Sequence, residues 1–194
     1  MSQQRADLRK QLRERRQRLG AEAQAQAGKQ LLETIRKENI IDGSQHIALY
    51  LANDGEIDPA PLVQWLWRQG IQCYLPVLHP EAKNRLLFFA YDNSTPLKTN
   101  RFGIHEPVIS EHAQPMAPEK LDLVFMPLTG FDEQGQRLGM GGGFYDRTFE
   151  FTSKSGKPRL IGLAHECQKV DDTLPSSWDI PMQGVVTDQR FYSC

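Results

Sequence analysis

The chain has 194 residues, of which 39% are hydrophobic and 24% are charged, and its formal net charge at pH 7 is -1. This length predicts a single domain with a sizeable core, and the composition excludes a disordered chain. The near-neutral charge excludes a protein that binds nucleic acid through its overall charge, and the lack of a long apolar run in the sequence excludes a membrane-spanning helix.

Two helices are predicted at the start of the chain, over residues 3–18 and 21–38. The first stretch has no Gly or Pro, and Leu8 and Leu12 lie one helical turn apart. Residues 1–20 hold seven basic residues against two acidic ones, so the first helix carries a basic face. A solvated helix face is the usual interpretation of such a run of charge. We apply it to four of these residues: Lys10, Arg13, Arg15 and Arg16.

Short apolar runs of strand length follow, over residues 46–52, 71–78 and 86–92. Between the first two runs the sequence predicts a helix, with Asp58 as its N-cap and its end at Gly70. Residues 93–118 contain four prolines among polar residues, so we expect a long irregular connection there.

The second half of the chain predicts a helical segment over 143–153 and three strands, over 121–127, 159–165 and near 184–188. Strands that alternate with helices predict an α/β fold with a mainly parallel central sheet, helices on both faces and an N-terminal helical segment. No repeat or linker divides the sequence, and we expect one domain over residues 1–194. Ligands of such folds bind at the carboxyl ends of the strands, where the loop after 121–127 lies.

That loop leads to a glycine cluster, RLGMGGGFYDR at residues 137–147. The cluster is not a GxGxxG dinucleotide loop, which needs glycine where Phe144 stands, and it lacks the GK[ST] ending of a P-loop. Consecutive glycines still let backbone N–H groups approach an anion, although a tight packing turn would use the same residues. Nearby, Arg137 offers charge for a phosphate, Tyr145 a stacking face and Asp146 a metal ligand.

The longer stretch FMPLTGFDEQGQRLGMGGGFYDR resembles the signature of the 5-formyltetrahydrofolate cyclo-ligase family, roughly P-x-x-G-F-D-x-x-G-x-R-L-G-x-G-x-G-[YF]-[YF]-D. Three further pieces occur in the family's order: RADLR near the start, YLANDGEID after the first strand, and GLAHECQ followed by LPSSWDIPMQGVVTD. The resemblance therefore spans almost the whole chain. The sequence departs from the family at Arg5, where relatives often have lysine, at Phe144, where tyrosine is frequent, and at Met140, where tyrosine or arginine is frequent.

This resemblance implies an enzyme that uses ATP and Mg²⁺ to convert 5-formyltetrahydrofolate into 5,10-methenyltetrahydrofolate, ADP and phosphate. The formyl oxygen would attack the γ-phosphate, and nitrogen-10 of the folate would then close the ring as phosphate leaves. The protein's task would be to align two ligands and to neutralise phosphate charge.

The resemblance also implies roles for individual residues. Tyr145 and Arg137 would be catalytic, and Asp146 and Asp179 would hold Mg²⁺. ATP would contact Arg5, Arg9, Arg137, Leu138, Gly139, Met140, Gly141, Gly142, Gly143, Phe144 and Tyr145. The folate would contact Leu51, Glu56, Met140, Gly141, Gly142, Gly143 and Phe144.

From the residues alone, structural interpretations of these positions stay open. Asp146 can stabilise the start of a helix, Asp179 can form a turn and Glu56 can cap the helix that follows it. Leu51 and the pair Phe144 and Tyr145 can simply belong to the core.

We expect small-molecule ligands only, with no nucleic acid and no membrane as partner, and a monomeric, cytoplasmic protein. The three cysteines form no CxxC pair, which favours a reducing compartment, and the first residues lack the apolar segment of a signal peptide. Two alternatives remain: an isomerase or CoA-transferase relative on a similar scaffold, and an RNA-associated module that uses the basic first helix.

Overall fold

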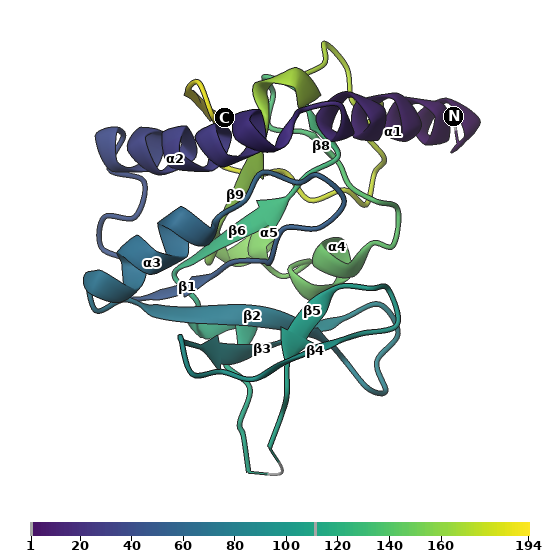
Figure 1. Cartoon of the computed structure of the whole chain (residues 1–194). Helices are drawn as coiled ribbons and strands as arrows, with labels where there is room; N and C mark the ends of the chain where they lie inside the picture. The colour runs from purple at the N-terminus through teal and green to yellow at the C-terminus, as the bar shows by residue number, and fades with distance from the viewer. Residues whose placement is uncertain (1, 111) are drawn as a thin grey trace.

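The computed structural model describes residues 2–110 and 112–194. Its first two helices, α1 (Ser2–Gln17) and α2 (Ala21–Lys37), follow one another across the top of the molecule in Figure 1. Leu31 and Ile35 of α2 are fully buried because they lie on its apolar face, one helical turn apart. Both helices have nearly the predicted bounds.

The centre of the fold is a seven-stranded sheet with the strand order β11-β10-β9-β6-β1-β2-β3. The strands β2, β1, β6, β9 and β10 pair in parallel, while β3 and β11 are antiparallel edges. The mainly parallel sheet that the sequence predicts is thereby confirmed. The sheet strands are β1 (His46–Ala48), β2 (Gln72–Leu78), β3 (Leu86–Tyr91), β6 (Leu123–Pro127), β9 (Arg159–Ala164), β10 (Gly184–Thr187) and β11 (Phe191–Ser193).

Helices cover both faces of this sheet, as the sequence predicts. On one face, α2 and α3 (Ala60–Arg68) pack Leu31, Leu62 and Leu66 against the strands. On the other face, the segment containing the short helices α4 (Phe144–Thr148) and α5 (Thr152–Ser155) packs Phe149 against Phe88. The strands β2 and β6 are mostly apolar because most of their residues are buried between the two helical layers.

The sequence prediction was wrong in several details. Residues 93–118 are not wholly irregular, because β4 (Leu97–Thr99) and β5 (His105–Pro107) pair as a hairpin within them. Pro59, not Asp58, occupies the N-cap of α3, although the Asp58 carboxylate accepts a bond from the Ala60 N–H at 2.9 Å. The predicted helical segment 143–153 is two short helices. The elements not predicted are β7 (Gly130–Phe131), β8 (Arg137–Leu138), β11, and the 3-10 turns η1 (Pro118–Lys120) and η2 (Glu166–Gln168).

Helix α1 lies across the carboxyl ends of the central strands. Its Arg16 donates to the carbonyls of Asp54, after β1, and Leu128, after β6. The same helix contacts η2, which follows β9. The carboxyl edge of the sheet, where ligands bind in such folds, is therefore bounded by the basic helix.

Candidate functional site

The glycine cluster forms a loop that leaves the β7–β8 hairpin and enters α4. Gly141 has φ +95° and Gly143, the N-cap of α4, has φ +66°. Side chains other than glycine rarely adopt this left-handed backbone, so the path of the loop itself requires glycine at both positions.

Side chains from three other segments hold the carbonyl groups of this loop. Nε of Arg9 donates to the Gly139 carbonyl at 2.8 Å. The Gly142 carbonyl accepts from Nδ2 of Asn84 at 2.8 Å and from Nη1 of Arg147 at 2.9 Å. Within the described residues, the N–H groups of Gly141, Gly142 and Gly143 donate to no protein group. The loop therefore offers N–H donors to an anion, while its Gly139 and Gly142 carbonyls already accept hydrogen bonds.

Two ion pairs meet beside this loop. Nη1 of Arg5 lies 2.8 Å from Oδ2 of Asp179, and it also donates to Ser176 and to the Leu174 carbonyl. Arg137 donates to Oδ1 of Asp146. That same Oδ1 accepts from the N–H of Ile180, the residue after Asp179, at 3.2 Å. The two predicted metal ligands, far apart in sequence, thus lie on neighbouring segments.

The donor set of these two aspartates fits Mg²⁺. Protein bonds engage only Oδ1 of Asp146 and Oδ2 of Asp179; within residues 2–110 and 112–194 the other oxygen of each has no hydrogen-bond partner. No group of three or more metal-ligating side chains gathers in this part of the chain. One or two carboxylates beside water and substrate phosphates is the set that Mg²⁺ usually takes in enzymes that bind nucleotides.

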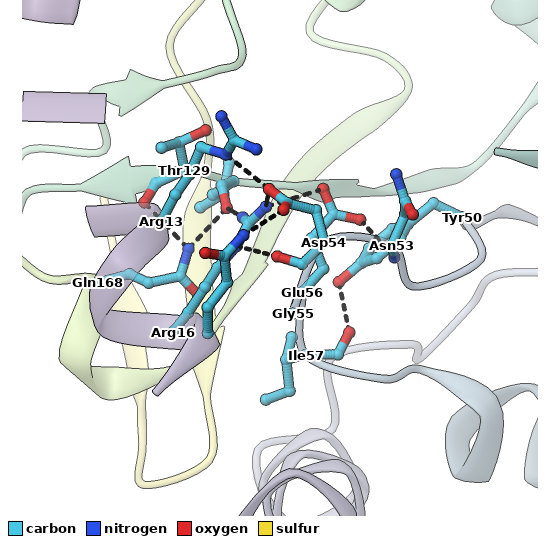
Figure 2. A network of polar contacts seen from close by, with 12 residues as sticks. Arg13, Arg16, Tyr50, Asn53, Asp54, Gly55, Glu56, Ile57, Thr129 and Gln168 are labelled. Carbon is cyan, nitrogen blue, oxygen red and sulfur yellow. Dashed lines mark hydrogen bonds and ion pairs between the residues drawn. The ribbon is translucent and has the colours of Figure 1, made fainter. Parts of the chain in front are cut away.

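Glu56 lies on the turn after β1, and its carboxylate is largely buried, with 14% of the side chain exposed. Oε2 accepts from the Asn53 N–H at 3.1 Å, and Oε1 lies 3.8 Å from Nη2 of Arg16 (Figure 2). Burial raises the pKa of Glu56 from 4.5 to about 7, although the charge of Arg16 opposes this shift. Burial, and secondarily the charge of Glu56, raises the pKa of Tyr145. Tyr145 and Glu56 are therefore close enough to interact electrostatically.

A cavity of about 500 Å³ opens next to Phe144, the first residue of α4. Its wall includes Phe144, whose ring meets that of Phe102 edge-on with centroids 5.9 Å apart. Other lining residues come from the turn after β2 and from the β4–β5 hairpin: Asn84, Lys83, Lys98 and Arg101. Sequence reasoning missed these residues, since nothing in residues 78–84 or 98–106 matches a motif and only the fold brings the two segments next to Phe144.

The geometry joins the predicted glycine loop, Arg5, Arg9, Asp146 and Asp179 at the carboxyl edge of the sheet. The chain matches the 5-formyltetrahydrofolate cyclo-ligase family over residues 1–188. It belongs to that family. The family and the enzyme class predicted from the sequence are thereby confirmed.

Relatives in this cyclo-ligase family match nearly full length. The 5-formyltetrahydrofolate cyclo-ligase of Escherichia coli strain K12 is 41% identical over 182 residues, which cover 93% of this chain and 98% of that protein. The Haemophilus influenzae protein of the same name is 44% identical, with 93% and 96% covered. The solved structure of 5,10-methenyltetrahydrofolate synthetase from Aquifex aeolicus is 27% identical, has a TM-score of 0.81, and is covered to 92% by 97% of this chain.

Two sequence interpretations change at this site. Arg16 is not part of a solvated face: none of its side chain is exposed, because it lies beneath the turn that carries Glu56. Arg137 is buried, and its guanidinium donates to Asp146 and to the Ile180 carbonyl. Its predicted contact with phosphate stays a prediction. Of the other predicted residues, Leu51 is half-buried beside Tyr50, and Met140 is 56% exposed on the loop. No helix in the described part of the chain has the length and apolarity needed to span a membrane.

Proposed function

We propose that this cyclo-ligase family member uses ATP and Mg²⁺ to convert 5-formyltetrahydrofolate into 5,10-methenyltetrahydrofolate, ADP and phosphate. One observation carries the proposal. Three kinds of group converge at the carboxyl edge of the sheet. They are the N–H groups of the glycine loop, the guanidinium groups of Arg5 and Arg9, and the carboxylates of Asp146 and Asp179, each of which bonds to the described residues through one oxygen. This combination suits a triphosphate with its metal.

The phosphate side of the proposed site is built from the loop and from α1. The N–H groups of residues 139–143 and the side chains of Arg5, Arg9 and Arg137 would bind the nucleotide, together with Leu138, Phe144 and Tyr145. Burial, with the adjacent charge of Arg5, lowers the pKa of Arg9. A guanidinium stays charged despite such a shift, and the mutual repulsion of Arg5 and Arg9 is relieved when an anion binds between them.

The folate side of the proposed site faces Glu56. The carboxylate of Glu56 would accept the amino and ring N–H donors of the pterin, with Leu51 as its apolar neighbour. Met140 and the glycines would line the folate, and Phe144 would separate the pterin from the cavity described above. Relatives often carry tyrosine at residue 144, so the phenylalanine supplies the ring without the hydroxyl.

The reaction needs a good leaving group on the formyl carbon. The formyl oxygen attacks the γ-phosphorus, the bond to ADP breaks, and the formyl C–O becomes a phosphate ester. Nitrogen-10 then forms a bond to the formyl carbon and loses its proton, while the C–O bond breaks and phosphate leaves. The glycine loop, with Arg5 and Arg9, would hold ATP in line with the formyl oxygen, and Tyr145 would orient the folate beside the phosphates. When bound by Asp146 and Asp179, Mg²⁺ supplies charge neutralisation for the phosphates.

Incubation of the protein with 5-formyltetrahydrofolate, ATP and Mg²⁺ is expected to produce the near-ultraviolet absorbance of the methenyl product. Omission of ATP should abolish the signal, which separates this activity from that of an isomerase or a CoA-transferase relative. Folded protein that gives no product would overturn the proposal. We also propose a monomeric, cytoplasmic enzyme without nucleic-acid partners; sedimentation of the purified protein tests the first point, and a salt-dependent RNA-binding assay tests the last.

A further inference from the structure

Arg16 is the largest fully buried side chain in the described part of the protein, although it belongs to the most basic segment of the chain. Burial of a guanidinium is costly unless its donors are satisfied. An arginine that is fully buried in this charged segment therefore has a specific task at its position.

Arg16 donates hydrogen bonds to the turn after β1 and to the end of β6. Nε donates to the Asp54 carbonyl at 2.9 Å, and Nη2 donates to the Asp54 carboxylate at 2.9 Å. Nη1 donates to the Leu128 carbonyl at 2.9 Å, an oxygen that also accepts from Gln168 at 2.7 Å. Figure 2 shows this side chain reaching from α1 to the turn. One residue thus joins α1, the β1 turn and the β6 end.

The turn held in this way has an unfavourable backbone. Asp54 has φ +53° and Gly55 has φ +75°, two successive residues in the left-handed region. A non-glycine residue in that region costs free energy and persists only where its surroundings impose it. Besides Arg16, the Asp54 carboxylate accepts from Arg13 at 2.6 Å and from Gln17. The Arg13 side chain is 41% exposed, so its bond to Asp54 constrains the turn little. The bonds of the fully buried Arg16 side chain supply the main constraint, and they orient Glu56 two residues later.

We propose that Arg16, together with Asp54, is a positioning residue for folate: it holds the strained turn so that the Glu56 carboxylate faces the pterin site. This inference rests on the proposed folate contact of Glu56. It predicts that loss of Arg16 weakens the binding of 5-formyltetrahydrofolate and leaves the binding of ATP nearly unchanged, because Arg5 and Arg9 hold the phosphate side independently.

The positive charge of Arg16 also affects the pKa of Glu56. The groups that face Glu56 are Arg16 from α1, Asp54 of the turn, Tyr50 after β1 and Tyr145 of α4. Both phenols have raised pKa values and stay neutral near pH 7. His165, beside the turn, has a pKa lowered by burial. Among residues 2–110 and 112–194, Arg16 is thus the one cation whose charge lowers the pKa of Glu56, and its removal moves that pKa further upward.

The test compares Arg16→Gln with Arg13→Gln by steady-state kinetics. Arg13 contacts the same carboxylate but is 41% exposed, so it is the matched control. We expect Arg16→Gln to raise the KM for 5-formyltetrahydrofolate by about 10-fold or more and the KM for ATP by less than about twofold, with Arg13→Gln below about threefold for both. The pH at which the KM for 5-formyltetrahydrofolate reaches its low plateau should rise in Arg16→Gln, because Glu56 then ionises at higher pH. Arg16→Lys, which keeps the charge, should restore the wild-type pH profile in part.

Equal increases in both KM values, or an unchanged pH profile, would overturn the inference. If Arg16→Gln fails to fold, as judged by circular dichroism and thermal melting, Asp54→Asn is the second test. It removes the carboxylate that Arg16 binds and leaves the two bonds from Arg16 to carbonyl groups. The same selective loss of folate binding is then expected. Glu56→Gln separates the two proposals: if it leaves the folate KM unchanged, the proposed folate site fails, whereas a rise in Glu56→Gln alone overturns the role of Arg16 and Asp54.

Discussion

Nη1 of Arg5 lies 2.8 Å from Oδ2 of Asp179, which joins the first turns of α1 to a loop 174 residues later in the chain. Both side chains are largely buried, with 10% and 8% exposed. The pair fixes the N-terminal helix and the metal-side loop relative to each other. A charge in such a buried pair is costly to leave alone, so each partner depends on the other.

Replacement of Arg5 therefore tests the phosphate side of the site. We expect Arg5→Gln to raise the KM for ATP by about 10-fold, because one guanidinium near the phosphates is lost and Asp179 is released. Lys10→Gln, an exposed change on the same helix, is the control and should leave the KM within about twofold. Initial rates at varied ATP measure both; equal behaviour of the two variants would contradict the assignment of Arg5.

Removal of the Asp146 charge tests the metal site. Asp146→Asn should raise the Mg²⁺ concentration needed for half-maximal activity by about 10-fold, because a neutral amide is a poorer ligand for a hard cation. The exposed carboxylate of Glu150, which follows α4 and pairs with Arg85, gives the control Glu150→Gln. Titration of activity with Mg²⁺ measures the effect. An unchanged Mg²⁺ requirement in folded Asp146→Asn would argue against the ligand role.

The raised pKa of Glu56 predicts a pH-dependent effect on stability. Between pH 4.5 and about 7 the folded state keeps a proton on Glu56 that the unfolded state releases, so this residue lowers the free energy of unfolding as pH rises through that window. The full effect is at most about 3 kcal/mol and is reached above pH 7. Glu56→Gln should therefore raise the melting temperature at pH 8 more than at pH 4.5. A difference that is the same at both pH values would show that the pKa is not raised.

The glycine loop predicts opposite outcomes at two neighbouring positions. Gly141→Ala forces a side chain onto a backbone with φ +95° and should cost about 1–2 kcal/mol or move the loop, with a clear loss of ATP binding. Gly139→Ala meets no atom within 4 Å and needs no left-handed backbone, so it should keep nearly full activity. Thermal melting and the KM for ATP distinguish them. Equal tolerance at both positions would show that the loop path is not required.

Several features could be read from the sequence because they depend on local order. The helices over 3–18 and 21–38 follow from spacing and from the lack of breakers, and the strand over 121–127 follows from an apolar run closed by proline. The β4–β5 hairpin was missed because its strands are three residues long and polar, so they carry no period. Nor does the sequence pattern of residues 143–153 indicate that this segment forms two helices and not one.

The family was determined by the sequence itself, since a spaced signature is a one-dimensional pattern, and the same signature predicted the residues of the site. Only the tertiary structure decided which of the basic residues on α1 are exposed. Arg13 and Arg16 lie three positions apart, and nothing local distinguishes them. Arg16 is buried because the carboxyl ends of β1 and β6 arrive beneath it and offer carbonyl and carboxylate acceptors. A buried charge depends on partners brought together by the fold, and those partners are distant in the sequence.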